Sequence, residues 1–126
     1  MNNLKSILNS SEKQFRKLLE NQESKKLNAD GCHLGQNDMK LDKAKKIIKN
    51  KIFGVTCHNS KELVKKAIKV KPSYIAIGAF FKSTTKEVKY KANISFLKYV
   101  KKLTNIPAVT IGGINNKNYK KLLLNK

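Results

Sequence analysis

The chain has 126 residues and a formal net charge of +20 at pH 7, because 28 lysines and arginines stand against 8 aspartates and glutamates. This length suits one domain with a hydrophobic core of its own. No apolar run reaches the roughly 18 residues that a membrane helix requires, and no apolar segment typical of a secretory signal lies near the start. We therefore expect a cytoplasmic globular protein and exclude an integral membrane protein.

The positive charge is almost entirely lysine, since Arg16 is the only arginine. A field of this size attracts anions such as nucleic acid or phosphorylated small molecules. Proteins that read nucleic acid usually combine arginine with exposed aromatic side chains. Here lysines occur in every predicted helix, which is also typical of a lysine-biased composition, so nucleic-acid binding stays open as an alternative.

Residues 1–26 have a helical pattern and form a predicted helical leader. Ser10 or Ser11 can cap this helix, and Phe15, Leu18 and Leu19 recur on one face. We expect residues 27–126 to form the folded domain that follows it.

From residue 29 onward, predicted strands alternate with predicted helices. The strands are expected at 29–36, 51–58, 74–81 and 106–113, and the helices at 41–50, from Asn59 or Ser60 onward, 94–103 and 116–126. Short links between alternating elements are typical of βαβ units with a parallel sheet. The strands are apolar on both faces, which indicates a sheet covered by helices. The fold class is therefore α/β, either a doubly wound sheet or part of a (β/α)8 barrel.

Polar residues and glycines follow the ends of all four predicted strands. In parallel α/β sheets, ligands bind at the carboxyl ends of the strands. An aspartate suits Mg²⁺, hydroxyls and a lysine suit phosphate oxygens, and a glycine pair lets backbone N–H groups approach a phosphate. The candidate residues are Asp38, Thr56, Ser83, Thr85, Lys86, Gly112 and Gly113. Each also has a structural interpretation as a helix cap, a strand residue, a loop residue or a turn, and only their joint placement favours a site.

Two predicted strands carry adjacent cysteine and histidine residues, Cys32–His33 and Cys57–His58. The spacing is not that of a zinc ribbon, and neighbouring strand residues point to opposite faces. We therefore expect reduced, partly buried thiols rather than a metal site or a disulfide framework.

Four segments resemble, in order and spacing, successive strands of the thiamine phosphate synthase family and its thiazole tautomerase relatives. They are "ADGCHLGQND", "GVTCHNSKE", "YIAIGAFFKSTTK" and "IPAVTIGGIN", and the resemblance runs from about Leu27 to the end of the chain. The hydroxyls and lysine of the third segment resemble a synthase, and the catalytic histidine of a tautomerase has no counterpart in "KSTTK". The resemblance implies part of a TIM barrel, and an enzyme that joins a pyrimidine pyrophosphate to a thiazole phosphate with Mg²⁺.

The resemblance also implies a role for each candidate residue. Asp38 corresponds to a magnesium-binding aspartate, and Thr56 stands where the family usually has a serine that contacts pyrophosphate. Ser83 and Thr85 correspond to hydroxyls on the side of the thiazole phosphate. Lys86 corresponds to a lysine that contacts pyrophosphate and stabilises its departure. Gly112 and Gly113 correspond to a phosphate-binding turn.

The resemblance covers four strands, whereas a complete barrel has eight. The family's Gln-x-Arg-x-Lys segment and its strand ending in Asn-Asp have no counterpart, and neither does its last strand. We therefore expect little synthase activity from the chain alone. The missing strands would come from a second copy or a partner chain, or the chain would be a phosphate-binding fragment without turnover.

Overall fold

The computed structural model describes residues 30–84, 87 and 89–124. The strands are β1 (Gly31–Leu34), β2 (Ile52–His58), β3 (Tyr74–Ile77) and β4 (Ala108–Thr110). The helices are α3 (Leu41–Ile48), α4 (Lys61–Lys69), α5 (Ile94–Leu103) and α6 (Lys120–Leu123). The leader predicted at residues 1–26 lies outside the described residues. Within them, no helix is long and apolar enough to cross a membrane.

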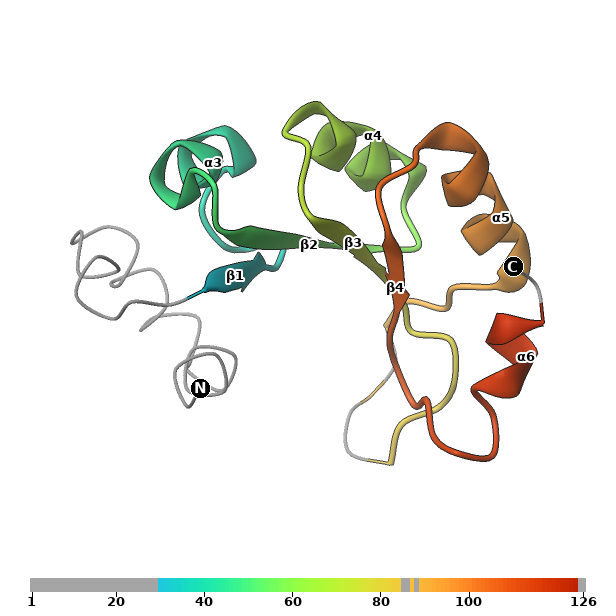
Figure 1. Ribbon diagram of the computed structural model, residues 1–126. Coiled ribbons are helices and arrows are strands. Elements are labelled where there is room, and N and C mark those ends of the chain that lie inside the picture. The colour runs from blue at the N-terminus through green and yellow to red at the C-terminus, as the bar shows by residue number, and fades with distance from the viewer. Residues whose placement is uncertain (1–29, 85–86, 88, 125–126) are drawn as a thin grey trace.

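The four strands form one parallel sheet in the order β1-β2-β3-β4. Figure 1 shows the helices in an arc along the outside of this curved sheet, with α6 continuing the arc beyond α5. Because every crossover returns the chain to the same end, all four strands finish at one edge of the sheet. The predicted α/β class with four parallel βα units is confirmed.

The hydrophobic core lies between the sheet and the helices α3, α4 and α5. Strand residues alternate between faces, so every second residue of β2 and β3 points toward the helices. The fully buried strand residues of this layer are Leu34, Phe53, Val55, Cys57, Ile75 and Ile77. The helices contribute Ala44, Ile48, Val64, Ala67, Phe96, Leu97 and Val100. Their spacing of three and four residues is that of an amphipathic helix, which explains why each helix packs by one side.

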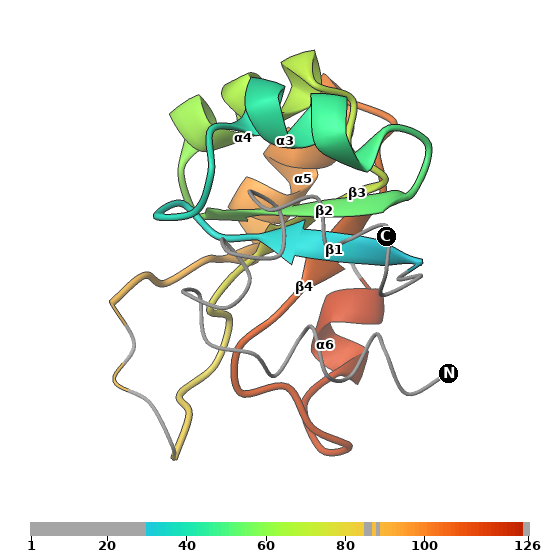
Figure 2. The same ribbon diagram turned by 90° about the vertical axis from the view of Figure 1, so that its left-hand side faces the viewer.

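The opposite face of the sheet is more exposed. Figure 2 shows α3, α4 and α5 on one side of the sheet only. On the other side, Ile52 is 52% exposed and Val109 is 42% exposed. The predicted covering of the sheet by helices therefore holds for one face. This is the arrangement expected of part of a (β/α)8 barrel rather than of a doubly wound sheet.

Side-chain caps fix the starts of two helices. Ser60 Oγ accepts a hydrogen bond from the N–H of Leu63 at 3.3 Å, so Ser60 rather than Asn59 is the cap of α4. Asn93 Oδ1 accepts a hydrogen bond from the N–H of Phe96 at 2.9 Å at the start of α5. Each cap satisfies a backbone donor that the helix itself leaves unpaired.

Replacing Asn93 with alanine is expected to destabilise the protein by about 1 kcal/mol, because the N–H of Phe96 loses its acceptor. Urea unfolding followed by circular dichroism measures this change. The Asn93→Ser variant keeps a capping oxygen and should unfold close to the parent midpoint. Equal losses in both variants would contradict the capping role.

All four predicted strands are longer than the observed ones, and the third and fourth continue into loops. The apolar runs 74–81 and 106–113 contain β3 and β4 but continue past them. There, the N–H of Phe80 donates to the carbonyl of Ile111, and the N–H of Phe81 donates to the carbonyl of Gly112, both at 3.1 Å. The extra apolar residues therefore join two loops rather than lengthen the sheet.

The last helix is also shorter than predicted, since α6 starts at Lys120 rather than near residue 116. Asn115 and Asn118 organise a turn before it. The N–H of Asn115 donates to Asn118 Oδ1, and the N–H of Lys117 donates to Asn115 Oδ1, each at 2.9 Å. Asparagine side chains compete in this way with helical hydrogen bonds.

Candidate functional site at the carboxyl edge of the sheet

Asp38 lies in the loop between β1 and α3, and its two carboxylate oxygens have different surroundings. Oδ2 accepts a hydrogen bond from the N–H of Gly35 at 2.6 Å. Oδ1 is buried and has no hydrogen-bond partner among the described residues. A buried carboxylate oxygen without a partner is costly, and a cation bound there would remove that cost. The chemistry of this oxygen therefore fits a metal ligand.

Thr56 lies near the end of β2 and is connected to β1 by two contacts. Its hydroxyl oxygen lies 2.6 Å from His33 Nε2. Its carbonyl accepts a hydrogen bond from the side-chain amide of Gln36. Because Gln36 precedes Asp38 by two residues, this contact holds the loop that carries Asp38 beside the end of β2.

His33 also contacts Tyr74, on the strand beyond β2. Its Nδ1 lies 2.9 Å from the phenol oxygen of Tyr74, and the two rings stack with centroids 5.6 Å apart. Burial lowers the pKa of His33, an effect that the negative charge of Asp38 opposes. Burial raises the pKa of Tyr74. A neutral imidazole thus lies between two neutral hydroxyl groups on the exposed face of the sheet.

Gly112 and Gly113 form the turn after β4, with φ angles of 94° and 63°. A Cβ on Gly112 would lie 2.3 Å from the Cβ of Ala79, and one on Gly113 would lie 2.4 Å from the carbonyl oxygen of Lys82. Only glycine accommodates both the positive φ and this close approach. The described residues accept no backbone hydrogen bond from the N–H of either glycine. The turn is therefore shaped for close packing against the loop after β3, with N–H groups left for another acceptor.

The three polar candidates after β3 are only partly described. Ser83 lies in the loop that follows β3, and Figure 2 shows this loop and the one after β4 extending from the same edge of the sheet. Thr85 and Lys86 lie outside the described residues, so their roles stay predictions. The structure thus brings the candidates together in two groups. The loop that carries Asp38 contacts Thr56 of β2 through Gln36, and the glycine turn after β4 packs against the loop after β3.

The cysteines lie on the helix side of the sheet, away from His33. Cys57 is buried, Cys32 is partly buried, and both are free thiols. Burial raises the pKa of each thiol to about 12, with a further contribution from Asp38 for Cys32. Both stay protonated near neutral pH. Among the described residues, no group of three or more His, Cys, Asp and Glu side chains could hold a metal ion.

His58 marks an irregularity at the end of β2. The register with β3 shifts between Thr56 and His58, and His58 has a φ of 51°. Its ring stacks on Tyr90 with centroids 4.2 Å apart, and burial lowers its pKa. This stacking connects the end of β2 to the far end of the loop after β3.

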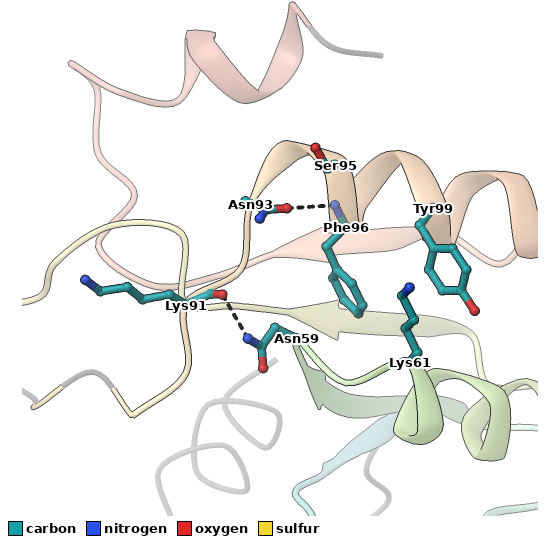
Figure 3. Close-up of a pocket in the computed structure, with 7 residues that line it drawn as sticks. All are labelled: Asn59, Lys61, Lys91, Asn93, Ser95, Phe96 and Tyr99. Atoms are coloured by element: carbon teal, nitrogen blue, oxygen red, sulfur yellow. Dashed lines mark hydrogen bonds between the residues drawn. The ribbon is translucent and has the colours of Figure 1, made fainter.

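A separate pocket of about 280 Å³ lies where α4 and α5 begin. Figure 3 shows Lys61 reaching beside Tyr99, and its Nζ lies 4.8 Å from the ring centroid. Asn59 Nδ2 donates to the carbonyl of Lys91 at 2.9 Å. None of the predicted site residues lines this pocket, so it is not part of the strand-end group.

The sequence does not predict the contacts of His33 with Tyr74 and with Thr56. It indicates His33 only as a possible metal ligand and Tyr74 only as a strand residue. One signal was present: a Cβ on Gly54 would lie 2.1 Å from the Tyr74 ring, so the glycine inside β2 makes room for that ring. A glycine within a strand often marks such a close approach.

Comparison with known proteins identifies relatives over most of the chain. A family profile described as "Thiamine monophosphate synthase" matches residues 21–126. The thiamine-phosphate synthase of Pelagibacter ubique (strain HTCC1062) is 64% identical over 103 residues, which are 82% of this chain and 50% of that protein. The thiamine-phosphate synthase of Clostridium acetobutylicum is 39% identical over 98 residues, 77% of this chain and 46% of that protein. The chain thus spans about half the length of these curated relatives.

A solved structure supports the fold. The thiamine phosphate pyrophosphorylase from Pyrococcus furiosus matches with a TM-score of 0.67 and 24% identity, over 93% of this chain and 64% of that one. The prediction of a partial (β/α)8 barrel is thereby confirmed for the described βα units. With a family profile matched from residue 21 to residue 126, the chain belongs to the thiamine monophosphate synthase family.

Proposed function

We propose that this chain contributes part of a thiamine phosphate synthase site, in which a pyrimidine pyrophosphate condenses with a thiazole phosphate to give thiamine phosphate and pyrophosphate. The observation that carries the proposal is the buried, unpartnered Oδ1 of Asp38 at the carboxyl edge of the sheet. This edge is where ligands bind in parallel α/β folds.

Asp38 is the proposed ligand of Mg²⁺, the cofactor of this function. Mg²⁺ is usually held by one or two carboxylates together with substrate phosphates and water, so a single carboxylate fits. When bound, the ion would neutralise charge on the departing pyrophosphate. The N–H of Gly35 holds the carboxylate of Asp38 by its other oxygen and leaves Oδ1 for the cation.

The remaining candidates are proposed to bind the two phosphorylated substrates. The hydroxyl of Thr56 donates to a pyrophosphate oxygen, and Lys86 stabilises the charge on the same group. Ser83, Thr85 and the N–H groups of Gly112 and Gly113 bind the phosphate of the thiazole. Their support is the placement of the described members at one edge of the sheet.

The proposed reaction breaks the bond between the pyrimidine methylene carbon and a pyrophosphate oxygen, which leaves with both electrons. The thiazole nitrogen then donates its lone pair to the methylene carbon and becomes the thiazolium nitrogen of the product. The residues of this chain orient the substrates and stabilise charge, and they form no covalent intermediate.

The experiment is an assay of the purified chain with hydroxymethylpyrimidine pyrophosphate, thiazole phosphate and Mg²⁺, with thiamine phosphate detected by mass spectrometry. Product that disappears with EDTA supports the proposal. Size-exclusion chromatography of the active fraction then shows whether the active species is a monomer or a dimer. No product from a chain that unfolds cooperatively in urea would contradict a self-sufficient synthase.

A second candidate is a phosphate-binding protein without turnover, and the observation that favours it is the buried, unpartnered Oδ1 of Asp38, which a cation bound together with a phosphate would satisfy without any reaction. It predicts Mg²⁺-dependent binding of pyrophosphate, measured by calorimetry, in a chain that makes no product. Product that forms only after a partner chain is added would support the synthase function instead. For either candidate we propose a cytoplasmic location, which the free, protonated thiols of Cys32 and Cys57 support.

A further inference from the structure

Tyr74, His33 and Thr56 form a hydrogen-bonded chain across three strands. In the sheet, His33 pairs with Gly54, and Gly54 pairs with Tyr74, so the three positions lie in one row. Thr56 lies two residues beyond Gly54 and shares its face. The missing side chain of Gly54 lets the Tyr74 ring cross β2, where its hydroxyl lies 2.9 Å from His33 Nδ1.

The two nitrogens of His33 must play different roles. A neutral imidazole carries one N–H and one lone pair, so it donates to one hydroxyl and accepts from the other. A phenol is a stronger hydrogen-bond donor than an aliphatic hydroxyl because its proton is more acidic. The favoured arrangement has Tyr74 donating to Nδ1 and Nε2–H donating to Thr56 Oγ1, which lies 2.6 Å away.

This direction decides what the Thr56 hydroxyl can do. If Thr56 accepts from His33, its own hydrogen stays available for a third group. In the reverse direction, Thr56 would donate to His33 and could offer a ligand only lone pairs, which an anion repels. A phosphate oxygen only accepts hydrogen bonds, so the first direction suits an anionic ligand and the second does not.

We propose that Tyr74 and His33 are positioning residues that direct the hydroxyl proton of Thr56 toward a pyrophosphate oxygen. The inference rests on the proposed function, since it assigns a mechanism to the pyrophosphate contact of Thr56. Neither positioning residue touches the ligand, and both act through the orientation of one hydroxyl. Fixing a hydroxyl before binding strengthens its contact, because little orientational freedom remains to be lost.

The direction of the chain can be tested without any ligand. The chain has two histidines, so their side-chain ¹⁵N resonances are readily assigned by removing one at a time. We expect His33 to be the tautomer protonated at Nε2, with Nδ1 unprotonated. The Tyr74→Phe variant should lose this preference, while His58 serves as the internal reference. A His33 protonated at Nδ1 would overturn the proposal.

The role of the chain is tested by calorimetric titration of Mg²⁺ and inorganic pyrophosphate into the full chain. We expect Thr56→Val to weaken binding about tenfold, because it removes a hydrogen bond to a charged group. We expect Tyr74→Phe to weaken binding about threefold, because it removes only the orientation of that hydroxyl. In the Thr56→Val background, Tyr74→Phe should have no further effect. Thr56→Ser keeps the hydroxyl and should bind within about twofold of the parent.

The outcomes separate this inference from the function on which it rests. Independent effects of Thr56→Val and Tyr74→Phe would overturn the positioning role while leaving the pyrophosphate contact intact. No effect of Thr56→Val would overturn the contact itself. If the parent chain fails to bind pyrophosphate, the proposed anion site is wrong, and so is the aiming of Thr56 toward pyrophosphate. Urea unfolding of each variant excludes loss of fold as the cause.

Discussion

The Asp38→Asn variant is expected to weaken Mg²⁺-dependent binding of pyrophosphate about 100-fold. Loss of a group that only orients a metal ligand already costs up to about 100-fold, and Asp38 is the proposed ligand itself. The amide keeps an oxygen for the N–H of Gly35, which Asp38 Oδ2 now accepts at 2.6 Å. It removes the charge that a cation requires at the buried Oδ1. Calorimetry with Mg²⁺ and pyrophosphate measures the loss.

The same variant should keep its stability or gain about 1 kcal/mol, because a carboxylate with one buried, unpartnered oxygen is replaced by a neutral amide. Opposite effects on binding and on folding are typical of a residue retained for function. Asp42→Asn is the matched control, since Asp42 is exposed in the first turn of α3. A large loss of stability in Asp38→Asn, or equal binding losses in both variants, would contradict the metal role.

Gly113→Ala is expected to destabilise the protein by about 2–4 kcal/mol, the largest stability effect predicted here. Its Cβ would lie 2.4 Å from the carbonyl oxygen of Lys82 and 2.7 Å from that of Phe81. These are backbone atoms, so a rotamer change cannot relieve the contact, and the φ of 63° adds strain for any residue with a Cβ. Thermal and urea unfolding measure the change.

Lys117→Ala provides the control in the same loop, because Lys117 is exposed and only its backbone N–H bonds to Asn115. It should unfold within about 0.5 kcal/mol of the parent. A Gly113→Ala protein as stable as the parent would show that the turn after β4 does not need the close approach to the loop after β3.

Much of the fold follows from the sequence because its signals are local. The helix predicted at 94–103 is α5 as observed, since its apolar spacing lies within the segment and its asparagine cap directly precedes it. The strands β3 and β4 are shorter than predicted because the apolar residues Phe80, Phe81 and Ile111 lie in the loops that follow them. Their backbones join two loops to each other, which is a long-range pairing that no local pattern records.

The candidate site divides in the same way. Alternating strands and helices bring the strand ends to one edge, so Asp38 and the turn of Gly112 and Gly113 could be placed there from sequence alone. The contacts of His33 could not, because they depend on the register that aligns His33 with Gly54 and Gly54 with Tyr74. Register is a property of strand pairing. The sequence shows only which residues of one strand share a face, not which residues of two strands lie side by side.

The one-sided core has a consequence for how this protein can change. The residues that hold the domain together lie between the sheet and its helices, whereas His33, Thr56 and Tyr74 lie on the other face. Substitutions of the exposed residues on that face, such as Ile52 and Val109, remove little of the packing between the sheet and its helices. Mutations there can therefore accumulate and be tested by selection for new ligands while the scaffold survives, which makes a chain of this design a tolerant starting point for evolution and engineering.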